Sequence, residues 1–130
     1  MATYRCITNN PLLEQKGIRN IEYHYDMDVL DILRYTADEV ARGCSLMSHP
    51  LTGSIRPDIT PYKSIIVTLE SAKHDPVSQM IMERAVVYAE DLYSMREVPL
   101  CKTCSEEAKQ DFQLIDYTII SRALDIEQLQ

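Results

Sequence analysis

The chain has 130 residues, of which 45% are hydrophobic and 25% are charged. This length suffices for one hydrophobic core, so we expect a single domain over residues 1–130. A net charge of −7 without a Lys/Arg cluster argues against nucleic-acid binding, and the apolar runs are too short for a membrane span.

The first part of the chain predicts a strand, a short helix and a second strand. Residues 3–8 carry the apolar side chains of Tyr4, Cys6 and Ile7 and are predicted to form the first strand. Asn10 and Pro11 then suit the cap and first position of a short helix, which Gly17 ends. Residues 21–25 alternate apolar and polar side chains, as in a strand with one exposed face.

The middle of the chain predicts one helix and two further strands. Asp26 is the expected cap of a helix that stops at Gly43. Residues 44–48 are compact and mostly apolar, which indicates a buried third strand. Residues 63–70 contain four large aliphatic side chains and give the strongest strand signal in the chain.

The rest of the chain is predicted to form two long helices. Asp75 and Pro76 start the first helix and Pro99 ends it, while Ser105 opens the second. The expected core stripe of the first helix is Val77, Met80 or Ile81, Arg84 or Ala85, Tyr88, Leu92 and Met95. That of the second is Ala108, Phe112, Ile115, Ile119, Ala123 and Ile126.

This order of elements predicts an α/β fold: a small, mostly parallel four-stranded sheet covered by helices, with two long C-terminal helices. The direction of the fourth strand stays open, because no helix connects it to the third. The two closing helices either pack on the sheet or form an antiparallel pair that makes a dimer contact.

The connection at residues 48–63 is the predicted working surface. It is much longer than the ~4–6 residues typical of compact domains, and such loops are often functional. If the first and third strands are parallel neighbours, their polar ends meet at one edge of the sheet, where ligands bind in open α/β folds. The candidate ligand-binding residues are Asn9, Asn10, Ser48, His49, Thr52, Gly53, Ser54, Arg56 and Lys63.

The chemistry of these side chains favours a small anion, such as a carboxylate or phosphate. His49, Arg56 and Lys63 would contact it, and Asn9, Thr52 and Ser54 would orient it. The alternative is structural: the three prolines of the loop stiffen a surface crossover, and its hydroxyl groups bond to the loop itself.

Cys101 and Cys104 form a CxxC directly before a predicted helix, where thiol pKa values fall. Redox motifs of this kind normally follow a strand, whereas this one joins two helices. No second CxxC and no histidine spacing completes a metal site, so we expect none. The acidic group Asp26, Asp28, Asp31, Asp38 and Glu39 is interpreted as a solvated helix face.

Two further features bear on the compartment and on cofactors. The N-terminus lacks the apolar core of a signal peptide, so we expect a cytoplasmic protein with reduced cysteines. No glycine-rich nucleotide-binding pattern occurs, and no cofactor is expected.

Two segments resemble the GrdX family. They are Ile7-Thr8-Asn9-Asn10-Pro11 and the run MSHPLTGSIRP at residues 47–57, which continues to TPYKS at residues 60–64. The family comprises small proteins encoded beside components of glycine, sarcosine and betaine reductase in amino-acid-fermenting anaerobes. The resemblance implies an accessory protein of that reductase system, with reductase subunits as partners, and assigns no catalytic residue.

The leading hypothesis is therefore an accessory protein that binds a small anionic ligand or a partner through the 48–63 loop. A thiol-redox helper that uses Cys101 and Cys104 is the second hypothesis. A dimeric assembly module built on the Tyr- and Met-rich helices is the third.

Overall fold

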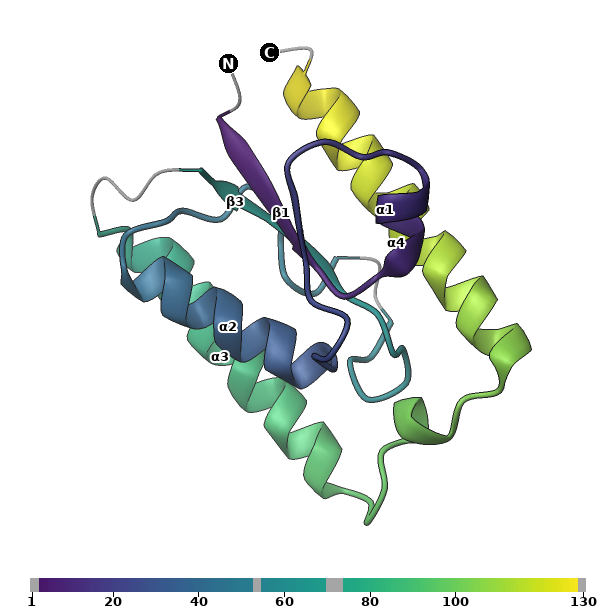
Figure 1. The fold of residues 1–130 in the computed structure, drawn as a ribbon. Helices are drawn as coiled ribbons and strands as arrows, with labels where there is room; N and C mark the ends of the chain where they lie inside the picture. The colour runs from purple at the N-terminus through teal and green to yellow at the C-terminus, as the bar shows by residue number, and fades with distance from the viewer. Residues whose placement is uncertain (1–2, 53–54, 70–73, 129–130) are drawn as a thin grey trace.

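The computed structural model describes residues 3–52, 55–69 and 74–128, which form three layers (Figure 1). The strands are β1 Tyr4–Thr8, β2 Ile21–Tyr23 and β3 Ser64–Thr68; the helices are α1 Pro11–Gln15, α2 Val29–Ala41, α3 Pro76–Ser94 and α4 Glu106–Gln128, with a 3-10 turn, η1, at Leu100–Thr103. Helices α2 and α3 lie side by side on one face of the sheet, and α1 and α4 cover the other.

The sheet is three-stranded and mixed, with the order β2-β1-β3. Strand β1 pairs in parallel with β2 and antiparallel with β3. The expectation of a four-stranded, mostly parallel sheet is therefore wrong, although the alternating α/β character is confirmed.

The segment at residues 44–48 does not become a strand, because side-chain hydroxyl groups replace part of its backbone ladder with β3. It makes one isolated antiparallel bridge, between Leu46 and Val67. The Ile66 amide donates to Ser48 Oγ at 2.9 Å, and the Ser45 amide donates to Thr68 Oγ1 at 2.9 Å. Hydroxyl groups that compete with a backbone ladder in this way interrupt a strand.

Two separate cores follow from the alternation of side chains along β1 and β3. Ile7, Ile65 and Val67 are fully buried against α2 and α3. Cys6 and Ile66 point to the opposite face, where they pack against α1 and α4. Each fully buried aliphatic side chain contributes on the order of 1.5–3 kcal/mol, so both faces of this small sheet stabilise the fold.

The helix ends are set by local chemistry. Asn10 caps α1 and Asp75 caps α3, as predicted. Helix α2 begins later than expected, with Asp28 and Asp31 forming a reciprocal capping box, so the prediction of Asp26 as the cap is wrong. Gly17 follows α1 with a φ of +71°, a left-handed conformation that glycine adopts without strain.

The long helices bury faces different from those that the sequence suggested. Helix α3 ends at Ser94, well before Pro99, and its buried side chains are Ser78, Met82, Ala85, Ala89 and Leu92. Val77 and Met95, which were expected in its core stripe, are 61% and 71% exposed. In α4 the buried positions include Ile120 and Leu124, whereas Ile115 is 40% exposed. Helix α4 is therefore rotated relative to its predicted apolar stripe.

Candidate functional site

Asn9 ties the carboxyl end of β1 to the last residues of the 48–63 loop. Its Nδ2 donates to the carbonyl oxygens of Met27 at 2.9 Å and Pro61 at 3.0 Å. Its Oδ1 accepts a hydrogen bond from the Lys63 amide at 2.8 Å. Asn9 therefore holds the loop, the end of β1 and the segment before α2 together.

Asn10 caps α1 and tethers α4. Its Oδ1 accepts from the Leu12 amide at 3.0 Å, which satisfies a free donor at the start of α1. Its Nδ2 donates to the Gln113 carbonyl at 2.9 Å and to Asp116 Oδ2 at 3.0 Å. Because Asn10 is fully buried, each of these groups lacks water as an alternative partner.

A chain of hydrogen bonds runs through the same region and ends on Asp116. The Asn10 amide donates to Thr8 Oγ1 at 2.9 Å, Thr8 Oγ1 lies 2.7 Å from Ser64 Oγ, and Ser64 Oγ donates to Asp116 Oδ2 at 2.6 Å. Since Ser64 gives its only proton to Asp116, Thr8 must be the donor to Ser64. The two strands β1 and β3 thus orient one carboxyl oxygen of Asp116.

Lys63 is the most unusual of the predicted site residues. It is 5% exposed, and its Nζ has no hydrogen-bond or ion-pair partner among residues 3–52, 55–69 and 74–128. It lines a cavity of about 20 Å³, which we call the inner cavity. The lining residues are Thr52, Ile55, Thr60, Tyr62, Lys63, Phe112, Ile115, Asp116 and Ile119.

Burial acts on the two ionisable groups of the inner cavity in opposite directions. It lowers the pKa of Lys63 below its ordinary value, against the opposing attraction of Asp116. It raises the pKa of Asp116, although hydrogen bonds from Ser64 and Asn10 and the charge of Lys63 act in the other direction. Both shifts favour the uncharged forms, as expected for groups removed from water.

A second and larger pocket, which we call the edge pocket, lies at the carboxyl edge of the parallel pair β1–β2. Its volume is about 350 Å³, within the range of small-molecule sites. It is lined by Asn9, Tyr25, Asp26, Met27, Asp28, Pro61, Tyr62, Cys101, Lys102 and Lys109. Residues from both ends of the chain thus converge where ligands bind in open α/β folds.

The edge pocket carries charged groups of both signs. Lys102 Nζ lies 2.6 Å from Asp28 Oδ2, which joins η1 to the start of α2. Burial alone would raise the pKa of Asp28, but hydrogen bonds from Lys102 and from the Asp31 amide hold it below its usual range. Lys109 Nζ lies 3.1 Å from Glu106 Oε1. The Tyr25 side chain is 82% exposed.

The turn at residues 48–52 lies away from the edge pocket and packs against α4. His49 Nδ1 accepts a hydrogen bond from the Leu51 amide at 3.1 Å, and Thr52 Oγ1 donates to the His49 carbonyl at 2.6 Å. Ser48, His49 and Thr52 line a pocket of about 200 Å³ against Ile119 and Ile120. Thr52 also lines the inner cavity, so it connects the turn to Lys63.

Arg56 lies elsewhere and is engaged by a carboxylate of its own loop. Its Nε and Nη2 donate to Asp58 at 3.1 and 2.7 Å, and the hydrogen bonds from Arg56 lower the pKa of Asp58. It faces Tyr88 of α3 in a pocket separate from Lys63. Gly53 and Ser54 lie outside the described residues. The predicted cations therefore do not share one pocket.

Sequence reasoning missed the residues that complete both pockets. Asp116, Lys102 and Lys109 were not singled out, because a polar residue on a long helix or a short turn resembles any solvated position. Asp116 directly follows Ile115, which was assigned to the core stripe of α4. The adjacent apolar pair Ile119-Ile120 left the buried face of this helix open in the sequence, and in the structure the buried residue is Ile120.

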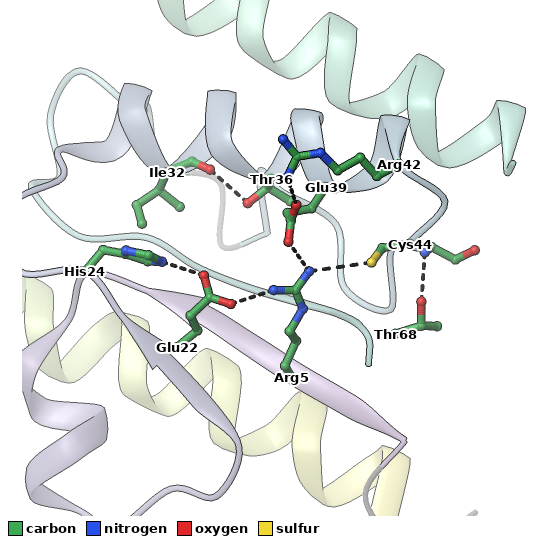
Figure 2. A network of polar contacts seen from close by, with 10 residues as sticks. Arg5, Glu22, His24, Ile32, Thr36, Glu39, Arg42, Cys44 and Thr68 are labelled. Carbon is green, nitrogen blue, oxygen red and sulfur yellow. Dashed lines mark hydrogen bonds and ion pairs between the residues drawn. The ribbon is translucent and has the colours of Figure 1, made fainter. Parts of the chain in front are cut away.

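A polar network under α2 was also missed (Figure 2). Arg5 of β1 reaches between Glu22 of β2 and Glu39 of α2, with 2.5 Å between its Nη1 and Glu22 Oε1. His24 Nε2 lies 2.6 Å from Glu22, and Arg42 Nη1 donates to Glu39 at 2.9 Å. The interpretation of Glu39 as part of a solvated face is thus wrong, because its side chain is only 12% exposed.

Cys101 and Cys104 are free thiols in different environments. Cys101 is 5% exposed and lies 3.5 Å from the Tyr93 hydroxyl. Burial raises its pKa, although Tyr93 and Lys102 act in the other direction. This shift opposes the thiolate that disulfide exchange needs, so the arrangement gives the redox hypothesis no support.

We expect Cys104 to react with iodoacetamide roughly tenfold faster than Cys101 in the native protein near pH 8. The reason is that Cys101 is buried and has a raised pKa, whereas Cys104 is partly exposed. Peptide mass spectrometry after timed quenching measures the two rates. Equal or inverted rates would contradict the burial of Cys101, and denatured protein serves as the control.

Among residues 3–52, 55–69 and 74–128, no group of three or more His, Cys, Asp or Glu side chains has the arrangement of a metal site. Across the same residues, the helices are too short or too polar to cross a bilayer.

Comparisons with known proteins identify a family and nothing closer. Searches of curated proteins and of solved structures gave no significant match. The family model described as GrdX-like protein matches residues 5–125, which include most of β1, the 48–63 loop and most of α4. Because this match spans nearly the entire chain, the protein belongs to the GrdX-like family.

Proposed function

We propose that this protein is an accessory protein of the glycine, sarcosine and betaine reductase system that binds a small amino acid or its N-methylated form in the edge pocket. The family supports the association with that system. The pocket supports the ligand class, because it offers cationic and anionic side chains within one small volume.

The observation that carries the proposal is the placement of charge around the edge pocket. Lys102 and Lys109 approach it from η1 and α4, and Asp26 approaches it from the segment before α2. A carboxylate ligand gains charge-assisted hydrogen bonds from ammonium groups. A ligand that also carries an amine matches the acidic side of the same pocket.

Tyr25 supplies a second feature suited to a cationic amine. Its ring is 82% exposed, which is unusual for so large an aromatic side chain, and it lines the edge pocket next to Asp26. The face of an aromatic ring attracts ammonium groups, and methylated ammonium groups are recognised in the same way. Tyr25 and Asp26 would therefore hold the amine while Lys109 holds the carboxylate.

The 48–63 loop contributes to this site through its last residues. Pro61 and Tyr62 form part of the wall, and Asn9 fixes them by the hydrogen bond to the Pro61 carbonyl. The cations predicted from the sequence to contact the ligand, His49, Arg56 and Lys63, do not line the edge pocket. In this proposal Lys102 and Lys109 replace them as the groups that contact the ligand anion.

Titration calorimetry with glycine, sarcosine and betaine tests the proposal. We expect saturable binding of at least one of them, weakened about tenfold or more in Lys109→Met, which corresponds to ~1.4 kcal/mol. Tyr25→Ala should weaken betaine more than glycine, because the methylated amine relies more on the aromatic face. Acetate and methylamine, each with one of the two charges, should bind less tightly than the zwitterion.

The matched control is Lys16→Met, which removes an exposed lysine of the α1 end outside the pocket. It should leave the affinity unchanged. Absence of heat for all three ligands at millimolar concentration, or equal losses in Lys16→Met and Lys109→Met, would remove the edge pocket as the ligand site.

The accessory role has a test of its own. Multi-angle light scattering of the protein alone and with purified reductase components would show complex formation and also measure its oligomeric state. The homodimer stays a prediction that the first of these measurements tests. A complex that forms only when the ligand is present would show that ligand binding in the edge pocket controls association with the reductase.

A further inference from the structure

Lys63 and Asp116 both line the inner cavity. Neither residue lines the edge pocket, although Tyr62 lines both. We propose that Lys63 is a nucleophilic amine that condenses reversibly with a small aldehyde to form an imine, with Asp116 as the group that transfers the protons. The proposal concerns a second site and does not depend on the ligand of the edge pocket.

The placement of the Lys63 amine is the first argument. Lys63 is 5% exposed, and its Nζ has no polar partner within hydrogen-bond or ion-pair distance in the described parts of the chain. A structural buried lysine normally ends on a carboxylate or on carbonyl oxygens. Here Lys63 instead lines a cavity, together with apolar residues such as Phe112 and Ile119.

The placement of Asp116 is the second argument. The side chains of Ser64 and Asn10 both donate to the same oxygen, Oδ2, and the Ser64 amide also donates to this carboxyl group. Asp116 lines the inner cavity together with Lys63, whose charge acts on it. A chain of hydrogen bonds through β1 and β3 fixes the orientation of this carboxyl group before any ligand arrives.

The protonation states fit the reaction. Burial lowers the pKa of Lys63 and raises that of Asp116. An uncharged amine is the form that attacks a carbonyl carbon, and a protonated carboxyl group is the form that donates to the carbonyl oxygen. Lysines activated in this way occur in apolar, water-poor surroundings.

The step balances without an added oxidant or reductant. The Lys63 nitrogen attacks the carbonyl carbon and forms the C–N bond, while the carboxyl group of Asp116 protonates the carbonyl oxygen. The resulting carboxylate accepts one proton from the nitrogen and gives it to the hydroxyl group, which leaves as water when the C–O bond breaks and the C=N bond forms. The second nitrogen proton then passes to the carboxylate and restores the protonated form of Asp116. The products are one imine and one water molecule.

The size of the cavity limits the aldehyde. A volume of about 20 Å³ holds roughly one water molecule. A carbonyl group with no large substituent fits such a space, whereas an aromatic aldehyde does not. The expected substrate class is therefore an aldehyde of very few atoms, for which formaldehyde is the probe.

The test is reductive trapping of the imine in the folded protein. Substoichiometric formaldehyde with cyanoborohydride near pH ~6 converts an imine to methyl-lysine, which peptide mass spectrometry locates. We expect Lys63 to be methylated roughly tenfold faster than Lys16, because exposed amines are almost fully protonated at this pH. A rate at Lys63 equal to or below that at Lys16 would overturn the proposal.

Two further experiments distinguish imine formation assisted by Asp116 from the general reactivity of a lysine amine. Benzaldehyde should label Lys16 and spare Lys63; labelling of Lys63 by both aldehydes would contradict the size limit. Asp116→Asn, with folding checked by thermal melting, should slow methylation of Lys63. If Asp116 acted only as a charge, its removal would favour the neutral amine and accelerate the reaction, so a faster rate would exclude proton transfer by Asp116.

Discussion

Replacing Arg5 with methionine is expected to lower the free energy of unfolding by about 3 kcal/mol, at the low end of the range for breaking a buried ion pair. Arg5 lies between the carboxylates of Glu22 and Glu39, and the three side chains are 17%, 29% and 12% exposed (Figure 2). The substitution leaves two half-buried negative charges facing each other. Glu22 keeps His24 and Tyr35 as partners and Glu39 keeps Arg42, which limits the loss.

The effect of this substitution should depend on pH in a defined direction. In the native protein, burial would raise the pKa of Glu22, but hydrogen bonds from Tyr35, His24 and Arg5 hold it below its ordinary value. A lowered pKa contributes stability above the unfolded-state pKa, and this stability is lost as the pH falls. Without Arg5 there is less stability to lose, so the difference between variant and native protein should shrink as the pH falls from about 5 to about 3, through the unfolded-state glutamate pKa of about 4.3.

Urea unfolding across this pH range measures the effect. Arg19→Met, at an exposed position on the connection between α1 and β2, removes the same charge and should change stability by no more than about 0.5 kcal/mol. A constant difference at all pH values would show that packing of the Arg5 side chain, and not its charge, is what matters.

A combined variant also tests whether the loss of stability in Arg5→Met is electrostatic. Arg5→Met with Glu22→Gln and Glu39→Met removes the charges together and should regain most of the lost stability, because an uncharged set no longer carries the desolvation cost. A triple variant as unstable as Arg5→Met alone would argue against an electrostatic origin.

Asn10→Ala is expected to destabilise the fold by about 3 kcal/mol. The fully buried side chain caps α1 through Leu12 and tethers α4 through Gln113 and Asp116. Its loss removes a helix cap, worth about 1 kcal/mol, and two donors, one of them to a carboxyl group. Thermal unfolding should show a midpoint lower by roughly 10 °C.

Asn10→Asp distinguishes the cap from the tether. Aspartate is as good a helix cap as asparagine, but it has no amide to donate to α4 and brings a second carboxyl group to Asp116. We expect it to be at least as destabilising as Asn10→Ala at neutral pH and to recover part of its stability in acid. Near-native stability of Asn10→Asp would mean that only the cap matters. The exposed Gln15→Ala, also in α1, is the neutral control.

Helix starts and strand runs could be predicted because they depend on neighbours in the sequence. Asn10-Pro11 and Asp75-Pro76 each place a capping side chain before a residue that lacks an amide hydrogen, and both caps are present. The aliphatic run in β3 is buried as expected. These features need no information from elsewhere in the chain.

Pairing in the sheet and the faces of the long helices could not be predicted in the same way. Residues 44–48 have the composition of a strand, yet Ser48 diverts the Ile66 amide to its hydroxyl group. The apolar pattern of α4 pointed to Ile115, whereas the helix turns Asp116 inward because Asn10 and Ser64 offer it hydrogen bonds. Both choices depend on partners far away in the sequence.

The amino-acid sequence by itself determined the α/β class and the family, and it predicted Asn9, Asn10 and Lys63 as candidate ligand-binding residues next to strands. Only the tertiary structure decided that Lys63 is enclosed with Asp116 while Arg56 is held by Asp58. The physical reason is that the burial of a polar side chain is decided by the elements that pack over it. For Lys63 one of these is a helix that begins at Glu106, more than forty residues later in the chain.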